Sequence, residues 1–402
     1  MRLFLIAHGL WNRTGHHYME ARAFKEEAAK RHLTGVILAH CDISPSVRDE
    51  LDALPLFRHT PYKPLFRRRY LGLLLDFLFF GRAMRQRLLS LPADEITAED
   101  ILVCPLTRAH EMLGLAWWLA RVPRKQHPFF AINFMVDDFF QGVSKTKLRT
   151  ISIKPSRLYR AAFNLLKKRL ASDRLLLSAG GTSFARTMSR MLNHPVEVFP
   201  LPVQHEFTSA TTVKSLPQQS PLIAFVGSMR KDKGADLVGA VIQRVLLENP
   251  GCRFFLQANP LSWEERWMND IGTAGKTRVH IHRGEMTQEE YQNTIKMADI
   301  VLLPYHSGQY TLQTSGVFSE AMAMGKVSVI PEGTWMADMV HKFKGGGILY
   351  PRQEVAAIAE ATLEALARLP QLTRDMQDIS GVWRETMGMK AFLQRILDKA
   401  AT

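Results

Sequence analysis

Short runs of consecutive apolar residues alternate with segments of helical periodicity along most of this sequence. A strand that is apolar at every position has both faces buried, which is typical of a parallel sheet covered by helices. In the first half, the expected strands are 2–7, 35–39, 101–105, 129–135, 175–178 and 196–200, and the expected helices are 18–31, 109–121, 157–170 and 183–192. These elements predict an α/β domain built on a parallel sheet.

The alternation is interrupted once and then resumes. Residues 204–221 are rich in Ser, Thr, Gln and Pro and lack apolar periodicity, which indicates a linker. Beyond them, the expected strands are 222–226, 252–257, 279–282, 299–304, 327–330 and 347–350, and the expected helices are 235–248, 288–297, 317–324, 355–368 and 382–400. We therefore predict two Rossmann-like, doubly wound domains over residues 1–205 and 221–380, a linker over 206–220 and a C-terminal helix within 381–402. Such sheets bind ligands beyond the carboxyl ends of their strands, so we expect the site in a cleft between the domains.

The excess of positive over negative charge is confined to the first half. The 402 residues carry a formal net charge of +14, and residues 1–205 contain 31 Lys and Arg against 17 Asp and Glu, whereas residues 206–402 contain 21 of each. Two windows, 58–88 and 145–174, hold eight and ten of these basic residues with one Asp each. A positive field on one domain indicates an anionic partner, such as a membrane surface, a nucleic acid or an acidic substrate, or else a solvated face without a partner.

The cysteines and the longest apolar runs indicate the cellular compartment in which the protein is expected. Cys41, Cys104 and Cys252 are far apart and odd in number, which favours a reducing cytosol and gives neither a metal-binding spacing nor a disulfide framework. No apolar run reaches the roughly 20 residues that a membrane-spanning helix needs. The start, MRLFLIAHG, is typical of a first strand rather than a signal peptide. We therefore expect a cytoplasmic protein.

A basic turn follows the first strand of the second domain, in the stretch PLIAFVGSMRKDKGADL at 221–237. Gly227 allows a tight turn and lets a ligand approach the backbone closely. Arg230, Lys231 and Lys233 lie just before Gly234 and the start of a helix, whose free N–H groups attract anions. Fixed donors together with mobile cations suit a diphosphate, and a basic surface turn without a ligand is the alternative.

A second polar loop separates a buried strand, ADIVLLPY at 298–305, from a short helix that starts near Gly316 and ends at Gly325. Glu320 lies one turn into this otherwise apolar helix, where a carboxylate is costly to bury without a partner. Two hydroxyls of a sugar ring are suitable donors to it, and a structural ion pair with Arg or Lys is the alternative.

Together these stretches resemble the donor-binding domain of retaining GT-B glycosyltransferases of the family 4 type, the glycosyl transferases group 1. The resemblance rests on FVGSMRKDKGADL, VHIHRGEMTQEEYQNTIKMADIVLLPY, SGVFSEAMAMGKVSVIPEG and GGGILYP, which cover most of residues 221–352 in the family's order and spacing. The first half resembles the family in architecture and in its first loop. The final helix, 382–400, resembles the family's helix that crosses back onto the first domain.

The resemblance implies transfer of a sugar, with retention, from a nucleotide-diphosphate sugar, and it implies neither a metal nor another cofactor. Lys233 matches the lysine that neutralises the diphosphate, and Glu320 matches the glutamate that accepts hydrogen bonds from the ribose. The family's arginine falls on Ser228, so Arg230 is expected to supply that charge, and the family's other glutamate falls on Leu312. The expected catalytic residues are Lys233, Arg230 and Glu320, and the expected donor-binding residues are Gly227, Ser228, Gly234, Thr314, Ser315, Gly316, Val317 and Glu320.

In this family the first domain takes the acceptor. Residues 9–17 lie where the family has a glycine-containing loop, and AINFMVDDF at 131–139 lies near the position of a family histidine. We expect acceptor or phosphate contacts from Gly15, His16, His17, Asn133 and Asp137, although His17 could instead simply open the first helix. Asp137 and Asp138 are adjacent and do not form the spaced Asp-x-Asp of metal-dependent glycosyltransferases, so no metal site is expected.

The basic window 58–88 also contains a run of leucines and phenylalanines at 71–80. Apolar residues flanked by arginines suit a helix in the headgroup region of an anionic bilayer, and a buried core helix is the alternative. We expect peripheral binding to the inner face of the cytoplasmic membrane, and a cell-envelope polysaccharide or lipid-linked acceptor. No RNA-binding or helix-turn-helix pattern is present, so no nucleic acid is expected. Two other functions stay open: a catalytically impaired GT-B protein that binds sugar nucleotides or polyanions, and a GT-B sugar-nucleotide epimerase.

Overall fold

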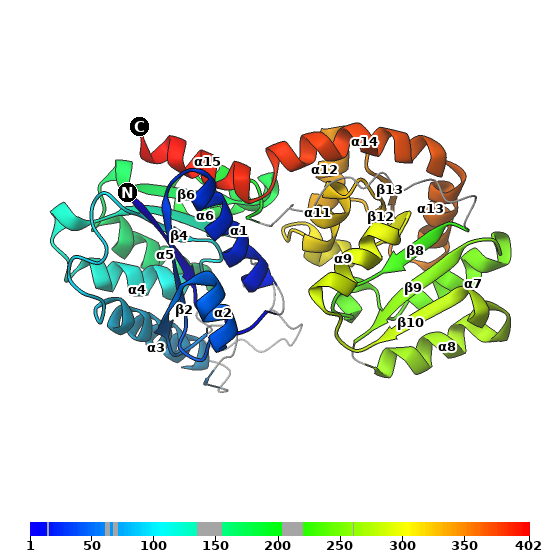
Figure 1. Cartoon of the computed structure of the whole chain (residues 1–402), viewed down its shortest axis with the longest axis horizontal. Coiled ribbons are helices and arrows are strands. Elements are labelled where there is room, and N and C mark those ends of the chain that lie inside the picture. Colours follow the sequence, from blue (N-terminus) through cyan, green and yellow to red (C-terminus); the bar gives the residue numbers. More distant parts are fainter. Residues whose placement is uncertain (14–15, 61–64, 67–70, 135–154, 203–219, 260) are drawn as a thin grey trace. The chain divides into compact units, whose positions relative to one another are not determined.

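The computed structural model describes residues 1–13, 16–60, 65–66, 71–134, 155–202, 220–259 and 261–402. They form two compact units, one made of Met1–Gln204 with Met387–Thr402 and the other of His205–Thr386. Each unit is built on one parallel sheet with helices on its faces (Figure 1). The predicted architecture of two Rossmann-like domains is confirmed.

The first unit has seven strands in the order β3-β2-β1-β4-β5-β6-β7, and every neighbouring pair is parallel. The strands are β1 (Arg2–Ala7), β2 (Thr34–His40), β3 (Ala53–Phe57), β4 (Ile101–Cys104), β5 (Phe129–Phe134), β6 (Leu175–Ala179) and β7 (Glu197–Val198). The helices are α1 (His16–Lys30), α2 (Pro45–Leu51), α3 (Leu71–Leu88), α4 (Ala109–Leu119), α5 (Pro155–Lys167), α6 (Thr182–Leu192) and α15 (Met389–Ala400), with single 3₁₀ turns η1 (Arg124–Gln126) and η2 (Ser172–Arg174). The strand order reverses between β1 and β4, which makes that edge the switch point of this sheet.

The second unit has six parallel strands in the order β10-β9-β8-β11-β12-β13. They are β8 (Leu222–Phe225), β9 (Arg253–Ala258), β10 (Val279–Arg283), β11 (Ile300–Leu302), β12 (Val327–Pro331) and β13 (Gly347–Tyr350). The helices are α7 (Val238–Glu248), α8 (Ser262–Gly275), α9 (Gln288–Met297), α10 (Ser307–Tyr310), α11 (Gly316–Ala323), α12 (Trp335–Phe343), α13 (Val355–Ala367) and α14 (Leu369–Thr386), with 3₁₀ turns η3 (Lys231–Lys233) and η4 (Lys276–Arg278). The switch point here lies between β8 and β11.

The central strands are buried along their whole length, as the continuous apolar runs predict. All six residues of β5 and all five residues of β12 are buried. The sequence does not reveal β3, because this edge strand is short, contains Pro55 and leaves Leu54 exposed. Helices α2, α8, α10, α12 and α14 are likewise additions to the predicted order.

The C-terminal segment contains two helices where the sequence predicts one. Helix α14 ends at Thr386 in the second unit, and α15 begins at Met389 in the first. Gly388 between them has φ of 87°, a conformation that favours glycine and interrupts the helix. Phe392, Leu393 and Ile396 of α15 belong to the first unit's hydrophobic core.

Helix α3, in the basic window, has one buried and one exposed face. Phe77, Phe80 and Met84 are buried, whereas Leu75 and Leu78 on the other face are about 40% exposed, at 39% and 41%. The buried face packs closely on α4, since a Cβ at Gly81 would lie 2.9 Å from Leu113 Cδ2 and one at Gly114 would lie 2.8 Å from Met84 Cβ. The helix is thus neither wholly a core helix nor wholly a surface helix. Within the described residues, no helix combines the length and the apolar character needed to cross a membrane.

Candidate functional site

The switch point of the second unit is shaped by two loops that hydrogen-bond to each other. One follows β8 and contains Gly227 and η3, and the other follows β11 and contains Pro304. The backbone N–H of His306 donates to Asp232 O at 2.8 Å. Gly234 has φ of 74°, and a Cβ there would overlap the Pro304 carbonyl group, so only glycine lets the two loops approach this closely.

Lys233 is held where these loops meet the start of α11. A Cβ on Gly227 would lie 3.5 Å from Lys233 Nζ and 3.4 Å from Val317 Cγ2, which places the ammonium group beside the first turn of α11. Lys233 Nζ also lies 5.5 Å from the centroid of the Tyr305 ring. Gly227 in turn is anchored by its N–H, which donates to Gln257 Oε1 at 2.9 Å. The lysine predicted to meet a diphosphate is therefore held in place, with its amine beside a helix N-terminus.

Helix α11 presents its N-terminus to this site. Ser315 is the N-cap, and its hydroxyl oxygen accepts from Phe318 N at 3.2 Å. Gly316 and Val317 in the first turn have N–H groups without a partner inside the helix, and these groups and the helix dipole favour an anion. Glu320 follows Val317 by three residues, so it faces the same side of the helix. Its carboxylate accepts a hydrogen bond from the Tyr291 hydroxyl.

Burial shifts the pKa values of both charged groups of this site, Glu320 and Lys233. Burial raises the pKa of Glu320 to about 7, against the opposing effects of the Tyr291 hydrogen bond and the Lys233 charge. Burial and the nearby Arg230 lower the pKa of Lys233 to about 8, against the opposing effects of Asp232 and Glu320. A cation and a carboxylate that are both partly desolvated gain from a ligand that offers phosphate oxygens to one and hydroxyl groups to the other.

Arg230 is paired within its own loop. Its Nε and Nη2 donate to the two carboxylate oxygens of Asp232 at 2.9 and 2.8 Å. Ser228 is exposed, and Thr314 and Leu312 are partly buried in the loop before α11. The structure thus groups Gly227, Lys233, Val317 and Glu320 around one point. Arg230 would have to exchange Asp232 for a phosphate in order to act there.

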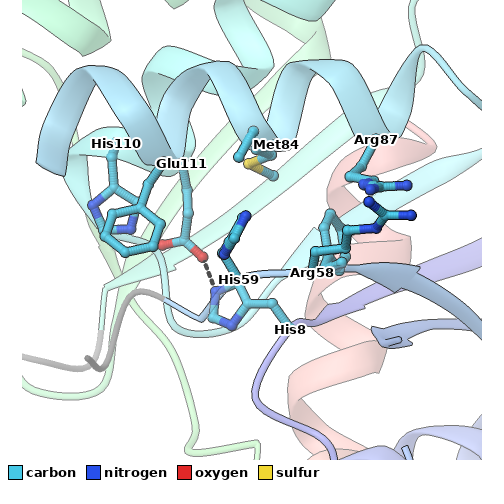
Figure 2. A pocket seen from close by; sticks show the side chains of 10 residues that line it. His8, Arg58, His59, Met84, Arg87, His110 and Glu111 are labelled. Atoms are coloured by element: carbon cyan, nitrogen blue, oxygen red, sulfur yellow. Dashed lines mark hydrogen bonds and ion pairs between the residues drawn. The ribbon is translucent and has the colours of Figure 1, made fainter. Parts of the chain in front are cut away.

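The first unit has a pocket at the corresponding edge of its own sheet (Figure 2). His8 follows β1 directly, and Glu111 lies in the first turn of α4, which follows β4. His8 Nε2 and a carboxylate oxygen of Glu111 form a buried hydrogen bond. The other carboxylate oxygen accepts from Arg108 N and completes a capping box at the start of α4.

Further basic residues line the same pocket, namely Arg58, His59, Arg87 and His110. Burial alone would raise the pKa of Glu111, but the adjacent His8 and His110 and the Arg108 backbone hydrogen bond lower it below its ordinary value. Burial lowers the pKa of His110 to about 4, so this imidazole is neutral near pH 7. The pocket is small, about 20 Å³, and combines an imidazole–carboxylate pair with cationic side chains.

The structure does not bring the predicted acceptor residues together at one site. His17, in α1, lies against Gly9, and its ring centroid is 4.1 Å from that of the exposed His16. Burial, with smaller effects of His16, His8 and Arg108, lowers the pKa of His17 to about 2. Asn133 is fully buried; its amide donates to Pro105 O at 3.0 Å, and its carbonyl oxygen accepts from Ser178 at 3.0 Å. Its side chain therefore supports the loop before α4. Gly15 and Asp137 lie outside the described residues.

One group of potential metal ligands occurs among the described residues, outside both switch points. His40, Cys41 and Asp42 bring one ligand atom each to within 4.8 Å of one another. The Asp42 N–H, however, donates to His40 Nδ1 at 3.1 Å, and Cys41 and Asp42 are exposed consecutive residues. This group is remote in sequence from Lys233 and Glu320 and contributes nothing to their site.

Sequence reasoning missed several residues of these two sites. Tyr291, Tyr305 and Gln257 carry no chemical signal in a stretch of strands and helices. His8 and Glu111 are 103 positions apart and meet only because β1 pairs with β4. The sequence does contain one weak signal, since His8 directly follows an expected strand and Glu111 lies in the first turn of the expected helix that follows another.

Comparison with known proteins gives the fold of the chain and a family match over part of its second unit. Residues 220–368 match the family model described as Glycosyl transferases group 1. Solved structures with the same fold include sucrose-phosphate synthase from Thermosynechococcus elongatus, with TM-score 0.64, 14% identity and coverage of 99% of this chain and 98% of that one. Another is HepE from Anabaena in complex with UDP, with TM-score 0.64, 12% identity and full coverage of both chains. A third is the E. coli trehalose-6-phosphate protein bound with UDP-2-fluoro glucose, with TM-score 0.66, 12% identity and coverage of 100% and 99%. No curated protein sequence matches the chain.

The protein therefore has the GT-B fold, in which two Rossmann-like units each present the carboxyl edge of a parallel sheet. Its second unit carries the match to the glycosyl transferases group 1, and that match spans both Lys233 and Glu320. The resemblance to GT-B glycosyltransferases read from the sequence is confirmed.

Proposed function

We propose that the protein transfers a sugar from a nucleotide-diphosphate sugar to a cell-envelope polysaccharide or lipid-linked acceptor, with retention and without a metal. The observation that carries this proposal is the position of Lys233, whose ammonium group lies beside Gly227 and the first turn of α11. One helix turn further, Glu320 supplies the acceptor atoms that a ribose needs. Two of the structures with this fold are bound to UDP or a UDP sugar, which supports a nucleotide-sugar donor.

The chemistry follows from the charge that develops on the leaving diphosphate. In the proposed reaction Lys233 and the N–H groups of Gly316 and Val317 stabilise this charge. Glu320 accepts hydrogen bonds from the ribose and so fixes the position of the diphosphate. Cations and backbone donors can in this way carry out the phosphate neutralisation that a metal ion performs in other transferases.

We assign the acceptor to the first unit, in the pocket of His8 and Glu111. The hydrogen bond to Glu111 fixes the orientation of the imidazole, and Arg58 and Arg87 offer contacts to an anionic group of the acceptor. Sugar phosphates and lipid-linked phosphates have the required combination of hydroxyl and anionic groups.

We also propose that the protein binds peripherally to an anionic membrane surface through α3. Leu75 and Leu78 are exposed on one face of this helix, and the exposed Arg82 follows them at helical spacing. Apolar side chains bordered by arginines suit the headgroup region of an anionic bilayer.

Thermal unfolding with UDP, GDP and ADP, and with their sugars, tests the donor proposal. A ligand that binds only the folded protein raises the midpoint, so the right nucleotide is expected to raise it in the wild type and not in Lys233→Ala. Lys231→Ala removes an exposed lysine from the same turn and should keep the shift. A panel in which no nucleotide shifts the midpoint would refute the proposal.

A further inference from the structure

A second basic site lies at the opposite edge of the first unit's sheet, where strands β4, β5 and β6 begin. It is a hollow of about 260 Å³ formed by three segments that precede these strands. Arg124, Lys125 and His127 come from the segment before β5, and Lys168, Arg169 and Arg174 come from the segment between α5 and β6. The hollow is therefore separate from the pocket of His8 and Glu111, which lies at the carboxyl edge.

The charges in this hollow have no internal compensation. Six of its nine lining residues are basic and none is acidic. Within the described residues, Arg124, Lys125, Lys168 and Arg169 form no ion pair, and neither do the nearby Glu99 and Asp173. Among the described residues, no carboxylate pairs with these four cations.

The walls of the hollow are nevertheless tied to the fold. The Arg174 guanidinium donates to Ala98 O at 2.6 Å and joins the segment after α5 to the one before β4. His127 Nε2 hydrogen-bonds to Val122 O at 3.0 Å, and Leu170 is buried. The exposed cations thus project from segments that have a fixed backbone.

Helix termini explain only part of this arrangement. Lys168 and Arg169 directly follow the last turn of α5, where cations stabilise the carbonyl end of a helix. Arg124 and Lys125 belong to η1, a different segment, and bring their charge to the same hollow. Like charges gathered in this way repel one another, unless an anion with several negative charges binds between them.

We propose that this hollow binds a ligand with phosphate groups that carry at least two negative charges. Arginine and lysine side chains from two segments can contact such a group from opposite sides, and arginine can do so with two parallel hydrogen bonds. The ligand is either a soluble phosphorylated metabolite or the phosphate headgroup of a lipid. This site does not depend on the proposed transferase activity.

Calorimetric titration with inorganic pyrophosphate tests this site, and the full chain with Lys233→Ala is used to weaken binding at the donor site. We expect saturable binding that Arg124→Ala with Arg169→Ala weakens at least tenfold, because each substitution removes a charge-assisted contact. The control is Arg186→Ala with Arg190→Ala, which removes the same charge from the exposed face of α6 and should leave affinity unchanged.

A vesicle arm distinguishes the two sources. If the ligand is a lipid headgroup, phosphatidate vesicles should likewise bind the Arg124/Arg169 variant at least tenfold more weakly than the Arg186/Arg190 variant. If the ligand is soluble, pyrophosphate shows the difference and the vesicles bind both variants equally. The proposal is overturned if pyrophosphate binds the two double variants equally. Nucleotide binding by either double variant with Lys233 intact reports separately on the proposed function.

Discussion

The two units place their candidate sites at the same point of the same kind of sheet, and they fill that point with different chemistry. In the second unit, which has 18 Lys and Arg against 20 Asp and Glu, one partly buried lysine and one glutamate lie beside a helix N-terminus. In the first unit, which carries the whole excess of positive charge, a buried imidazole–carboxylate pair lies among arginines and histidines. The fold therefore determines where each candidate site lies, and the side chains determine the chemistry that the site offers.

The largest difference between the two units is expected when Lys233 is removed from the second. Lys233→Ala should lower kcat/KM for release of nucleoside diphosphate by about 100- to 1,000-fold, because it removes a main donor to the leaving group. Steady-state assays measure this effect. Lys231→Ala should change the rate less than about threefold, and equal losses in both variants would mean that only the general positive charge of the turn matters.

Glu320 should make donor binding depend on pH. Binding needs the ionised carboxylate of Glu320, whose pKa is raised to about 7, and the protonated amine of Lys233, whose pKa is lowered to about 8. Affinity should therefore rise as pH increases through 7 and fall as pH increases through 8. Glu320→Gln should remove the rising limb and weaken donor binding about tenfold at its optimum. Calorimetry across this pH range would count against the assignment if the acid limb persisted in the variant.

A substitution in the pocket of the first unit should change the kinetics of the acceptor and leave nucleotide affinity unchanged. Glu111→Gln retains the side-chain oxygen that caps α4 and removes the negative charge beside His8. We expect about a tenfold loss in kcat/KM for the acceptor. A hydrogen-bonding partner that orients an imidazole, as Glu111 orients His8, typically contributes about this much. Nucleotide affinity, measured in parallel, should stay unchanged. If the variant also lost nucleotide affinity, the proposal that the first unit binds the acceptor and the second unit binds the nucleotide would be contradicted.

The smallest effect is expected at the surface of α3. Leu75→Asn with Leu78→Asn should weaken binding to anionic vesicles roughly tenfold or less, because both side chains are already partly buried. Leu247→Asn, on the second unit, is the control, since Leu247 is 80% exposed. Flotation at low salt compares the variants, and identical flotation would show that α3 does not contact the membrane.

The sequence signals for the candidate site of the second unit are each local. Lys233 and Gly234 follow one strand, and Glu320 stands out as the charged residue of an otherwise apolar helix. The sequence did not reveal that Asp232 would pair with Arg230, because an acidic residue within a basic turn has several possible partners.

The first unit could be predicted only as an architecture. Its pocket depends on the pairing of β1 with β4 and on the close packing of α3 on α4 through Gly81 and Gly114, and neither is visible as a spacing. The interpretation of Asn133 as an acceptor contact rested on its place at a strand end, where a buried amide also serves to anchor a loop. Whether Asn133 contacts a ligand or anchors a loop depends on long-range strand pairing. A single sequence does not show that pairing as a pattern of spacing.

The most direct test is a structure of the protein crystallised with a nucleoside diphosphate. The account predicts the diphosphate within hydrogen-bonding distance of Lys233 Nζ and of the backbone N–H groups at the start of α11, with the ribose hydroxyls donating to Glu320. A nucleotide bound elsewhere, with Lys233 and Glu320 untouched by it, would contradict the account.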